Sequence, residues 1–571
     1  MLRGIFGDRG FIWVTLVYGI VVSLLTLALP ISVQVLIGAV ANTAVVRSVV
    51  VLAIVLFTLL ALSGLLVAMQ TYVLELFQRR FYGRMSAEIA LRTIYSRTDR
   101  IEQINREGLM NHYFEIDVIL KALPSLLSNG LALGLQTLVG YLVVSFYHPV
   151  FLFFCVVHAL MVYLIWRHAD RGAVESVIQL SSAKHEMARW LEALARNHRH
   201  FKSEAGISFA VRRTDELADK YIARHKRHFG YFFSQHVGML ALYAIGSAVV
   251  LGVAGWLVIQ GQLSLGQLVA AELILGAIFV GLSRASYYLE LYYSIRGSLD
   301  KLSRVYHLPL EIVSGDQKIE EWHGDVVISG AAVNVRGCTY HIDAEFPAGS
   351  QTLVAAENSG IVMATLDILW GARRPDSGGA TLGGHDVRDF DPHRLRNEVK
   401  VVADSNLFEC TVVDYLHIGD PDLSRAKMRE LLNVVGLSSV IEQLPGGLDC
   451  LLNDGGMPLS NSEVLRLKIA QAIASRPRVL ILSPACDVLR LHRRQRILDY
   501  LNENSDLILI VFSNRRDLDH VSRYMNLCDS RSQVFLSLEE LLAEEARAAA
   551  LRESGPPKAV PPADPIVKES A

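Results

Sequence analysis

The sequence has few cysteines and little excess charge. Six cysteines occur in 571 residues, and none forms a Cys-x-x-Cys motif. A disulfide or zinc framework is therefore not expected, and no metal site is predicted. The net charge is −2 and the isoelectric point is near 6.8, which argues against a nucleic-acid-binding protein.

The sequence also contains no Gly-Lys-Ser or Gly-Lys-Thr. In a phosphate-binding loop these residues supply a lysine for phosphate and a hydroxyl for Mg²⁺, while the glycines let backbone N–H groups surround the anion. Yet residues 353–366 read as a strand, a loop of small residues and the start of a helix, the setting of such a loop. Aligned without gaps, the lysine falls on Val362 and the hydroxyl on Met363. The other loop positions fall on Ala356, Gly360 and Ile361.

Apolar residues are abundant and unevenly placed. They make up 51% of the chain, the mean hydropathy is +0.32, and the excess lies almost wholly before residue 296. A membrane-spanning helix needs about 20 mainly apolar residues. We therefore predict an all-α transmembrane domain at residues 1–310, with Pro30 as a kink in the first helix. Its six spans run roughly over residues 11–40, 49–76, 123–147, 150–166, 231–260 and 265–295.

Basic residues predict the orientation of these spans. Long polar excursions follow the second and fourth spans, at about 78–122 and 167–230, and both are rich in arginine; the short connections hold only Arg47. The positive-inside rule places both excursions, both termini and everything after residue 310 on the cytosolic side of the membrane, which is expected to be a bacterial-type inner membrane. Residues 1–10 are too short for the start of a cleaved signal peptide, so the first span is interpreted as a signal anchor.

Two groups of ionisable residues need an interpretation. His198, His200, His225 and His228 lie in an arginine-rich stretch without acidic or cysteine partners at ligand spacing, so a solvated helix face is preferred to a metal site. Ionisable groups within membrane spans are functional candidates because their burial is costly. Among them Arg284, which the prediction places deep in the sixth span, is the candidate for a central substrate cavity.

Five segments after residue 374 resemble, in order, motifs of the ATP-binding cassette of ABC exporters. Together with the six spans they make the chain similar to an ABC exporter half-transporter. Residues 190–196 and 261–274 particularly resemble the branch related to type I protein and peptide secretion. The motifs are Pro375-Asp-Ser-Gly-Gly and its continuation to Arg388, Leu407-Phe-Glu-Cys-Thr, Leu444-Pro-Gly-Gly-Leu-Asp449, Leu459-Ser-Asn-Ser-Glu463 and residues 466–482.

This resemblance implies an α/β P-loop NTPase-like cytosolic domain at residues 320–545. Residues 551–571, which are rich in proline, are expected to be disordered. The resemblance also assigns catalytic positions, and each holds a residue unsuited to its role. A proline, for example, can neither hold Mg²⁺ through water nor polarise a nucleophile. The Q-loop glutamine falls on Ala403, the Walker B aspartate and the next carboxylate on Ser483 and Pro484, the D-loop aspartate on Arg490, the switch histidine on Asn514 and the adenine-stacking aromatic on Val335.

The free energies involved indicate whether ATP can bind. Hydrogen bonds to charged groups contribute roughly 1.5–3 kcal/mol each, so loss of the lysine, the hydroxyl and the carboxylate should cost about 5 kcal/mol or more. That weakens binding at least roughly a thousandfold. We therefore predict no catalytic residue and no cofactor for this chain alone, with ATP and Mg²⁺ bound only through the site of a partner subunit.

Two classes of function remain open. The first is an exporter subunit paired with an ATPase-competent half-transporter; a heterodimer is favoured because two copies of this chain hold no intact site. In this family a site forms between one P-loop and the other subunit's signature, so Ser460, Asn461 and Ser462 are candidate contacts to a partner's ATP. Membrane lipid and a secretion-system adaptor are the other expected partners, without nucleic acid. The alternative is a non-transporting membrane scaffold or regulator.

Overall fold

The computed structural model describes residues 9–25, 28–42, 46–98, 113–311, 324–335, 337–503, 506–517, 521–529 and 531–553. Contacts between residues divide the chain into two compact units, Met1–Leu310 and Glu311–Ala571. Most of the predicted tail, residues 554–571, lies outside the described residues, while residues 551–553 end a helix.

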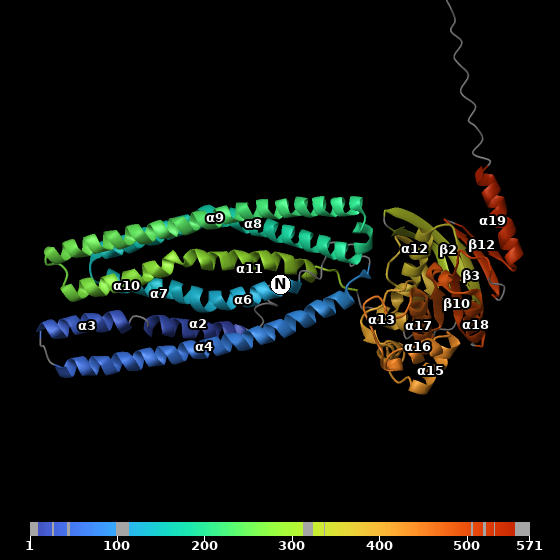
Figure 1. Cartoon of the computed structure of the whole chain (residues 1–571), viewed down its shortest axis with the longest axis horizontal. Coiled ribbons are helices and arrows are strands. Elements are labelled where there is room, and N and C mark those ends of the chain that lie inside the picture. Colours follow the sequence, from blue (N-terminus) through green and yellow to red (C-terminus); the bar gives the residue numbers. More distant parts are fainter. Residues whose placement is uncertain are drawn as a thin grey trace, which may run out of the picture. The chain divides into compact units, whose positions relative to one another are not determined.

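The first unit is built from helices (Figure 1). Within its described residues, six helices are long and apolar enough to cross a membrane, and this confirms the predicted six-helix membrane domain. These spans are Trp13–Ile37, Val49–Tyr95, Glu115–Ser145, Pro149–Arg196, Glu204–Ile259 and Leu265–Ser283. The elements are α2 (Arg9–Leu25), α3 (Ala28–Asn42), α4 (Val46–Tyr95), α6 (Glu115–Ser125), η2 (Leu126–Gly130), α7 (Leu131–Ser145), α8 (Pro149–Arg196), η3 (His198–Phe201), α9 (Glu204–Ile259), α10 (Leu265–Ser283) and α11 (Ala285–Tyr306).

Large apolar side chains point outward from this unit. In the most apolar 18-residue stretch of the second span, no residue is buried within the chain. Phe57 in that span is 73% exposed. A surface this apolar is stable in lipid or against another protein, but not in water. The first unit is therefore an integral membrane domain.

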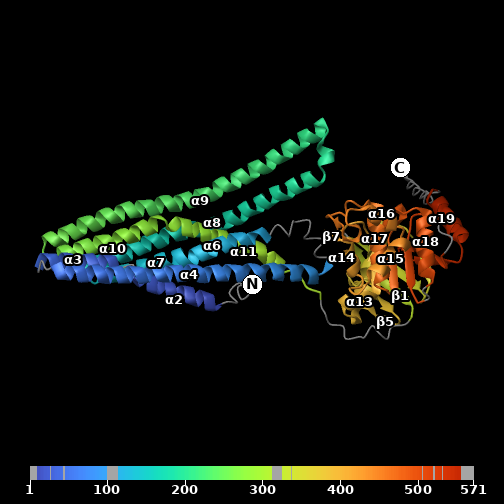
Figure 2. The ribbon, with the colours of Figure 1, turned by 60° about the horizontal axis from the view of Figure 1, so that its bottom comes forward.

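Helices α8 and α9 are much longer than a bilayer is thick. α9 has 56 residues, which at about 1.5 Å per residue is close to 84 Å, against a hydrocarbon core of about 30 Å. The two helices lie side by side (Figures 1 and 2). Near their joined ends, Trp190 Nε1 donates a hydrogen bond to Thr214 Oγ1 at 2.9 Å. The excursion 167–230 is thus a helical continuation of both spans.

The first and the sixth predicted spans each include two helices of the structure. In the first span, α2 is described to Leu25 and α3 from Ala28, and Pro30 lies in the first turn of α3, where a missing N–H costs little. The sixth span ends at Ser283, and α11 begins a separate helix at Ala285. Arg284 N donates to Gly281 O at 3.0 Å, a tight closing turn. Arg284 is therefore an exposed residue at the junction of α10 and α11, and its place in a central substrate cavity stays a prediction.

The third span contains a π-helical turn. Pro124 lies near the end of α6, and the five residues of η2 connect α6 to α7. Proline lacks an N–H and clashes with the carbonyl four residues earlier, and a wider turn next to it relieves the resulting strain in the helix. The span is thus continuous in direction but not in its hydrogen-bond pattern.

The second unit contains a six-stranded sheet in the order β12-β11-β3-β10-β9-β6. β12 is antiparallel to β11, and all other pairs are parallel. The strands are β3 (Gln351–Ala356), β6 (Val399–Val402), β9 (Val479–Leu482), β10 (Ile508–Phe512), β11 (Arg523–Cys528) and β12 (Arg531–Phe535). A separate antiparallel sheet joins β2 (Cys338–Phe346), β1 (Val326–Val335), β4 (Ser377–Leu382) and β5 (His385–Asp386), and β7 (Cys410–Thr411) pairs with β8 (Leu451–Leu452).

Apolar clusters cover both faces of the six-stranded sheet. Consecutive residues of β3 alternate between them, with Leu353 in one cluster and Val354 in the other. This explains why strands such as Val479–Leu482 are apolar without interruption.

The helices of the second unit are α12 (Ser359–Leu369), α13 (Pro392–Glu398), α14 (Val412–His417), α15 (Arg425–Val434), α16 (Ser438–Gln443), α17 (Asn461–Ala474), α18 (Leu491–Asn502) and α19 (Leu538–Glu553), with short turns η5 (Val387–Asp389), η6 (Gly447–Asp449) and η7 (Pro484–Val488). The predicted α/β fold of this unit is confirmed.

Candidate nucleotide-binding site

The predicted site positions gather at one edge of the parallel sheet. Parallel strands end at a common edge, where α/β proteins bind their ligands. Ala403 follows β6, Ser483 follows β9, and Asn514 comes two residues after β10. Ala356 ends β3, and the loop to α12 starts there. The structure therefore brings together residues that are up to 158 positions apart, from Ala356 to Asn514.

Asn358 from the loop itself and Tyr340 from β2 contact the segment that joins β3 to α12. Asn358 caps α12, and its Oδ1 accepts a hydrogen bond from Ile361 N at 3.0 Å. The ring of Tyr340, from β2, lies so close to Gly360 that a Cβ there would collide with it. In a phosphate-binding loop, backbone N–H groups at this position, such as that of Ile361, would face the phosphate. Here the side-chain oxygen of Asn358 already accepts the hydrogen bond of Ile361 N. Glu357, exposed in the same loop, adds a negative charge.

The lysine and hydroxyl positions of the loop face the apolar core. Val362 is 7% exposed and belongs to the cluster on one face of the sheet, and Met363 packs against the same cluster. Neither side chain carries a charge or a hydrogen-bond donor. The first turn of α12 consequently offers no cation to a phosphate.

At the ends of β9 and β6, a serine hydroxyl joins the two strands. Ser483 Oγ donates to Ala403 O at 2.9 Å, and Ser483 N donates to Val402 O at 3.0 Å. Pro484 then begins η7. Asp404, directly after Ala403, is already paired with Lys468 at 2.6 Å. No described residue at the Walker B or Q-loop position supplies a carboxylate or an amide side chain.

A second network, which sequence reasoning missed, is centred on Asp487 in η7. Its carboxylate accepts hydrogen bonds from Ser513 Oγ at 2.6 Å and from Asn514 N at 2.8 Å. Arg494, whose side chain is 6% exposed, lies 3.2 Å from both Asp487 and Asp517. The network ties the segment after β9 to the segment after β10. An aspartate three residues after Pro484 is the only sequence signal that points to it.

The signature position begins helix α17. Ser460 N and Ser460 Oγ each lie 2.8 Å from Glu463 Oε2 and donate to it. This arrangement is the back-reaching half of a capping box, in which a glutamate satisfies the N-terminal end of the helix. Asn461 is exposed and Ser462 half-buried beside it. The hydroxyl of Ser460 therefore already has an acceptor within its own chain.

Val335, the predicted adenine position, is buried in the core at the end of β1. It cannot present a flat aromatic face. Among the described residues, the first turn of α12 holds no cation, and Ser483 and Pro484, the two positions directly after β9, hold no carboxylate.

Comparison with known proteins indicates the class of this chain. No family model matches it. It is 27% identical over 258 residues to the alpha-hemolysin translocation ATP-binding protein HlyB of Escherichia coli O157:H7. The matched region covers 43% of this chain and 35% of HlyB. It is 24% identical over 409 residues to the mycobactin import ATP-binding/permease protein IrtB of Mycolicibacterium thermoresistibile, covering 67% of this chain and 66% of IrtB.

Among solved structures, a bacterial Atm1-family ABC exporter with ATP bound superposes with a TM-score of 0.79. The superposition covers 97% of this chain and 99% of that one at 17% sequence identity. The fold is that of an ABC exporter half-transporter, a six-span membrane domain joined to an ATP-binding cassette. Within this class the chain is similar to the type I secretion proteins, and the resemblance found in the sequence is confirmed; the match spans about a third of the length of these relatives.

Proposed function

We propose that this chain is the non-catalytic subunit of an ABC exporter. Its membrane domain forms half of the transport pathway, and a second half-transporter supplies ATP binding and hydrolysis. The observation that carries the proposal is the hydrogen bond from Ser483 to Ala403. It is a neutral contact between two strands, and it occupies the position where the ligands of Mg²⁺ and of the attacking water would lie.

The pairing follows from the same residues. Two copies of this chain would contain no lysine, Mg²⁺ hydroxyl or catalytic carboxylate at either site, so a homodimer would lack ATPase activity. A heterodimer retains one competent P-loop, that of the partner. In that complex Ser460, Asn461 and Ser462 of this chain would face the partner's ATP.

The capping arrangement of α17 favours a second candidate function. Glu463 places a carboxylate at the helix N-terminus, where a phosphate of the partner's ATP would otherwise be stabilised by the helix dipole. If Glu463 is not displaced, the shared site does not form. The chain would then be a membrane scaffold or regulator that keeps the exporter fold as an interaction surface.

The substrate class rests on the relatives. HlyB and the exotoxin translocation ATP-binding protein PaxB of Pasteurella aerogenes are named for the translocation of toxins, and IrtB for the import of mycobactin. A protein, peptide or lipid-like substrate is consistent with these names. We place the chain in a bacterial-type inner membrane, with the cassette and both termini in the cytosol and a secretion-system adaptor as a further partner.

The proposal is tested by purifying the full chain alone in lipid nanodiscs. We expect no ATPase activity above a mock preparation and no saturable ATP binding. Val362→Lys should also stay inactive, because one lysine does not restore the glycines, the hydroxyl or the carboxylates. Co-purification with the second half-transporter should yield ATPase activity that the partner's Walker B mutation abolishes. Saturable ATP binding by the isolated chain would contradict the proposal.

A further inference from the structure

The cassette contains a pocket at the edge of the sheet opposite to the strand ends described above. Its volume is about 450 Å³. Leu480, at the amino end of β9, and Leu507, just before β10, line it, and α15, α17 and α18 contribute its walls. Pockets of roughly 300–1,000 Å³ are the usual size for small-molecule sites.

The base of the pocket is apolar and well ordered by the core. Leu431, Leu480, Leu501 and Leu507 are each at most 5% exposed and face the pocket from three different elements and a loop. Ile473 is half-buried beside them. A ligand that fills this base must therefore present an apolar body.

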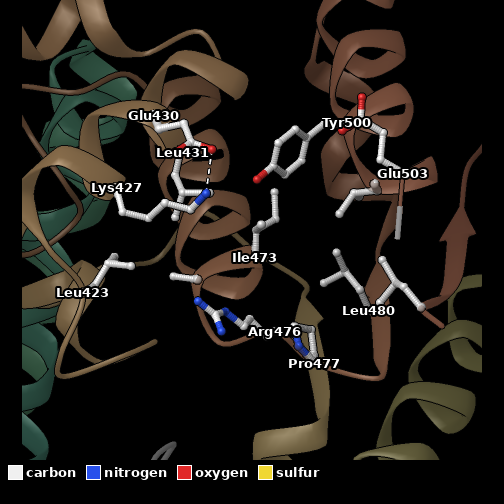
Figure 3. A pocket seen from close by; sticks show the side chains of 13 residues that line it. Leu423, Lys427, Glu430, Leu431, Ile473, Arg476, Pro477, Leu480, Tyr500 and Glu503 are labelled. Carbon is white, nitrogen blue, oxygen red and sulfur yellow. Dashed lines mark hydrogen bonds and ion pairs between the residues drawn. The ribbon is translucent and has the colours of Figure 1, made fainter. Parts of the chain in front are cut away.

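Hydrogen-bond donors surround the opening. Figure 3 shows the ammonium of Lys427 and the phenol oxygen of Tyr500 pointing toward each other across the pocket, with Arg476 below them. Lys427 is paired with Glu430 at 2.6 Å. In the described part of the chain, the Arg476 guanidinium and the Tyr500 hydroxyl make no hydrogen bond and no ion pair, so both are available to a ligand.

The backbone at Arg476 is unusual. It is the one non-glycine residue in the described ranges with a left-handed conformation, at φ 49°. The position directly after a helix, here after α17, commonly has this conformation, but glycine or asparagine is the relaxed choice there. A strained residue of this kind is a reason to look for a function of its side chain. Arg476 is also one of the residues that line the pocket.

We propose that this pocket binds a small amphipathic monocarboxylate, with its apolar body on the leucine base and its carboxylate between Arg476 and Tyr500. A guanidinium forms paired hydrogen bonds with a carboxylate, and the phenol O–H adds a third donor. Glu430 and Glu503 also line the pocket, and their charges disfavour a ligand that carries several phosphates. The site is separate from the nucleotide positions and does not depend on the proposed pairing.

The test uses 4-phenylbutyrate as the probe and the full chain in nanodiscs, measured by equilibrium dialysis against empty nanodiscs. We expect saturable binding of one molecule per chain. The neutral analogue 4-phenylbutanol should bind about tenfold more weakly or worse, since hydrogen bonds to a charged group are among the stronger ones. Inorganic phosphate should not compete, because it has no apolar body.

Three variants test the assignment of residues. Arg476→Asn removes the guanidinium but suits the left-handed backbone, so the melting temperature should stay the same or rise while binding weakens about tenfold or more. Tyr500→Phe keeps the ring and should weaken binding severalfold. Arg429→Asn, an exposed arginine on α15 that does not line the pocket, should leave binding unchanged. The proposal is overturned if the wild-type chain shows no saturable binding up to the solubility of the probe, or if binding survives Arg476→Asn.

Discussion

Ser483 and Ser460 both retain a hydroxyl group, but each hydroxyl is held within the chain. Ser483 donates to a backbone carbonyl, and Ser460 to a glutamate three residues later. Residue identity alone predicts that Ser460 can contact a partner's ATP. The structure adds a competition, since the same O–H cannot donate to Glu463 and to a phosphate at once.

The competition can be measured with Ser460→Ala. If Ser460 contacts the partner's ATP in the transition state, the ATPase activity of the co-purified complex should fall about tenfold to a hundredfold, the value of a hydrogen bond to a charged group. Ser460→Thr, which keeps a hydroxyl and a helix cap, is the positive control. Ser439→Ala, an exposed serine on α16, controls for changes at the surface. Unchanged ATPase activity and transport in Ser460→Ala would favour the scaffold function.

The cysteines of the cassette should differ sharply in reactivity. Burial raises the pKa of Cys486 to about 12, and its side chain is 5% exposed, whereas Cys338 is exposed. Only the thiolate reacts, so at pH 8 about one Cys486 in ten thousand is in the reactive form. We expect iodoacetamide to modify Cys338 in the folded chain and Cys486 only after unfolding, as seen by peptide mass spectrometry. Fast modification of Cys486 in the folded chain would mean that the segment after β9 opens.

At the level of elements, the sequence predicts what depends on local pattern. Residues 353–366 form β3 and α12 as expected, and Ser483 follows a buried apolar strand. The cluster of Asp487, Arg494 and Asp517 was not predictable, because it forms only when η7, α18 and the segment after β10 meet in the folded sheet. The junction at Arg284 was missed for another reason: the five residues after it, Ala285–Leu289, carry no charge and no proline or glycine, so composition marks no end to the helix there.

The Asp487 cluster should contribute to the stability of the cassette. Asp487→Ala removes one partner of a largely buried arginine, leaves Asn514 N without its acceptor and leaves Ser513 Oγ with only the more distant Arg515 O. Breaking a buried ion pair in this way costs about 3 kcal/mol, which is roughly 5–10 °C in melting temperature for a unit of this size. Asp499→Ala, an exposed aspartate on α18, is the matched control. A melting temperature equal to wild type would show that the cluster is dispensable.

At the level of the whole molecule, the order of the spans and their flanking charges determine which ends face the cytosol. The fold and the membrane character follow from the length and apolarity of the helices and agree with the relatives. Orientation depends on the basic residues that flank the spans at the membrane surface. The transmembrane orientation therefore remains a prediction of the sequence.

Topology reporters can measure this orientation directly. A single cysteine introduced at His148 or at Gln262, each in a short connection between spans, should react with a membrane-impermeant maleimide in intact cells. A cysteine at Arg213, in the extension of α9, should react only after the cells are opened. The reverse pattern at two of these sites would refute the six-span orientation.

The π-helical turn Leu126–Gly130 sets the rotational phase of the third span. One extra residue in a turn rotates all later side chains by about 100° around the helix axis. Gly140, in α7, lies so close to Ile278 that a Cβ would collide with it, so this contact exists only in the present phase. Deleting one residue from the turn would leave every span at nearly its full length, yet it would turn the glycine away from its partner. In this span, the number of residues before a contact is therefore as important as their identity.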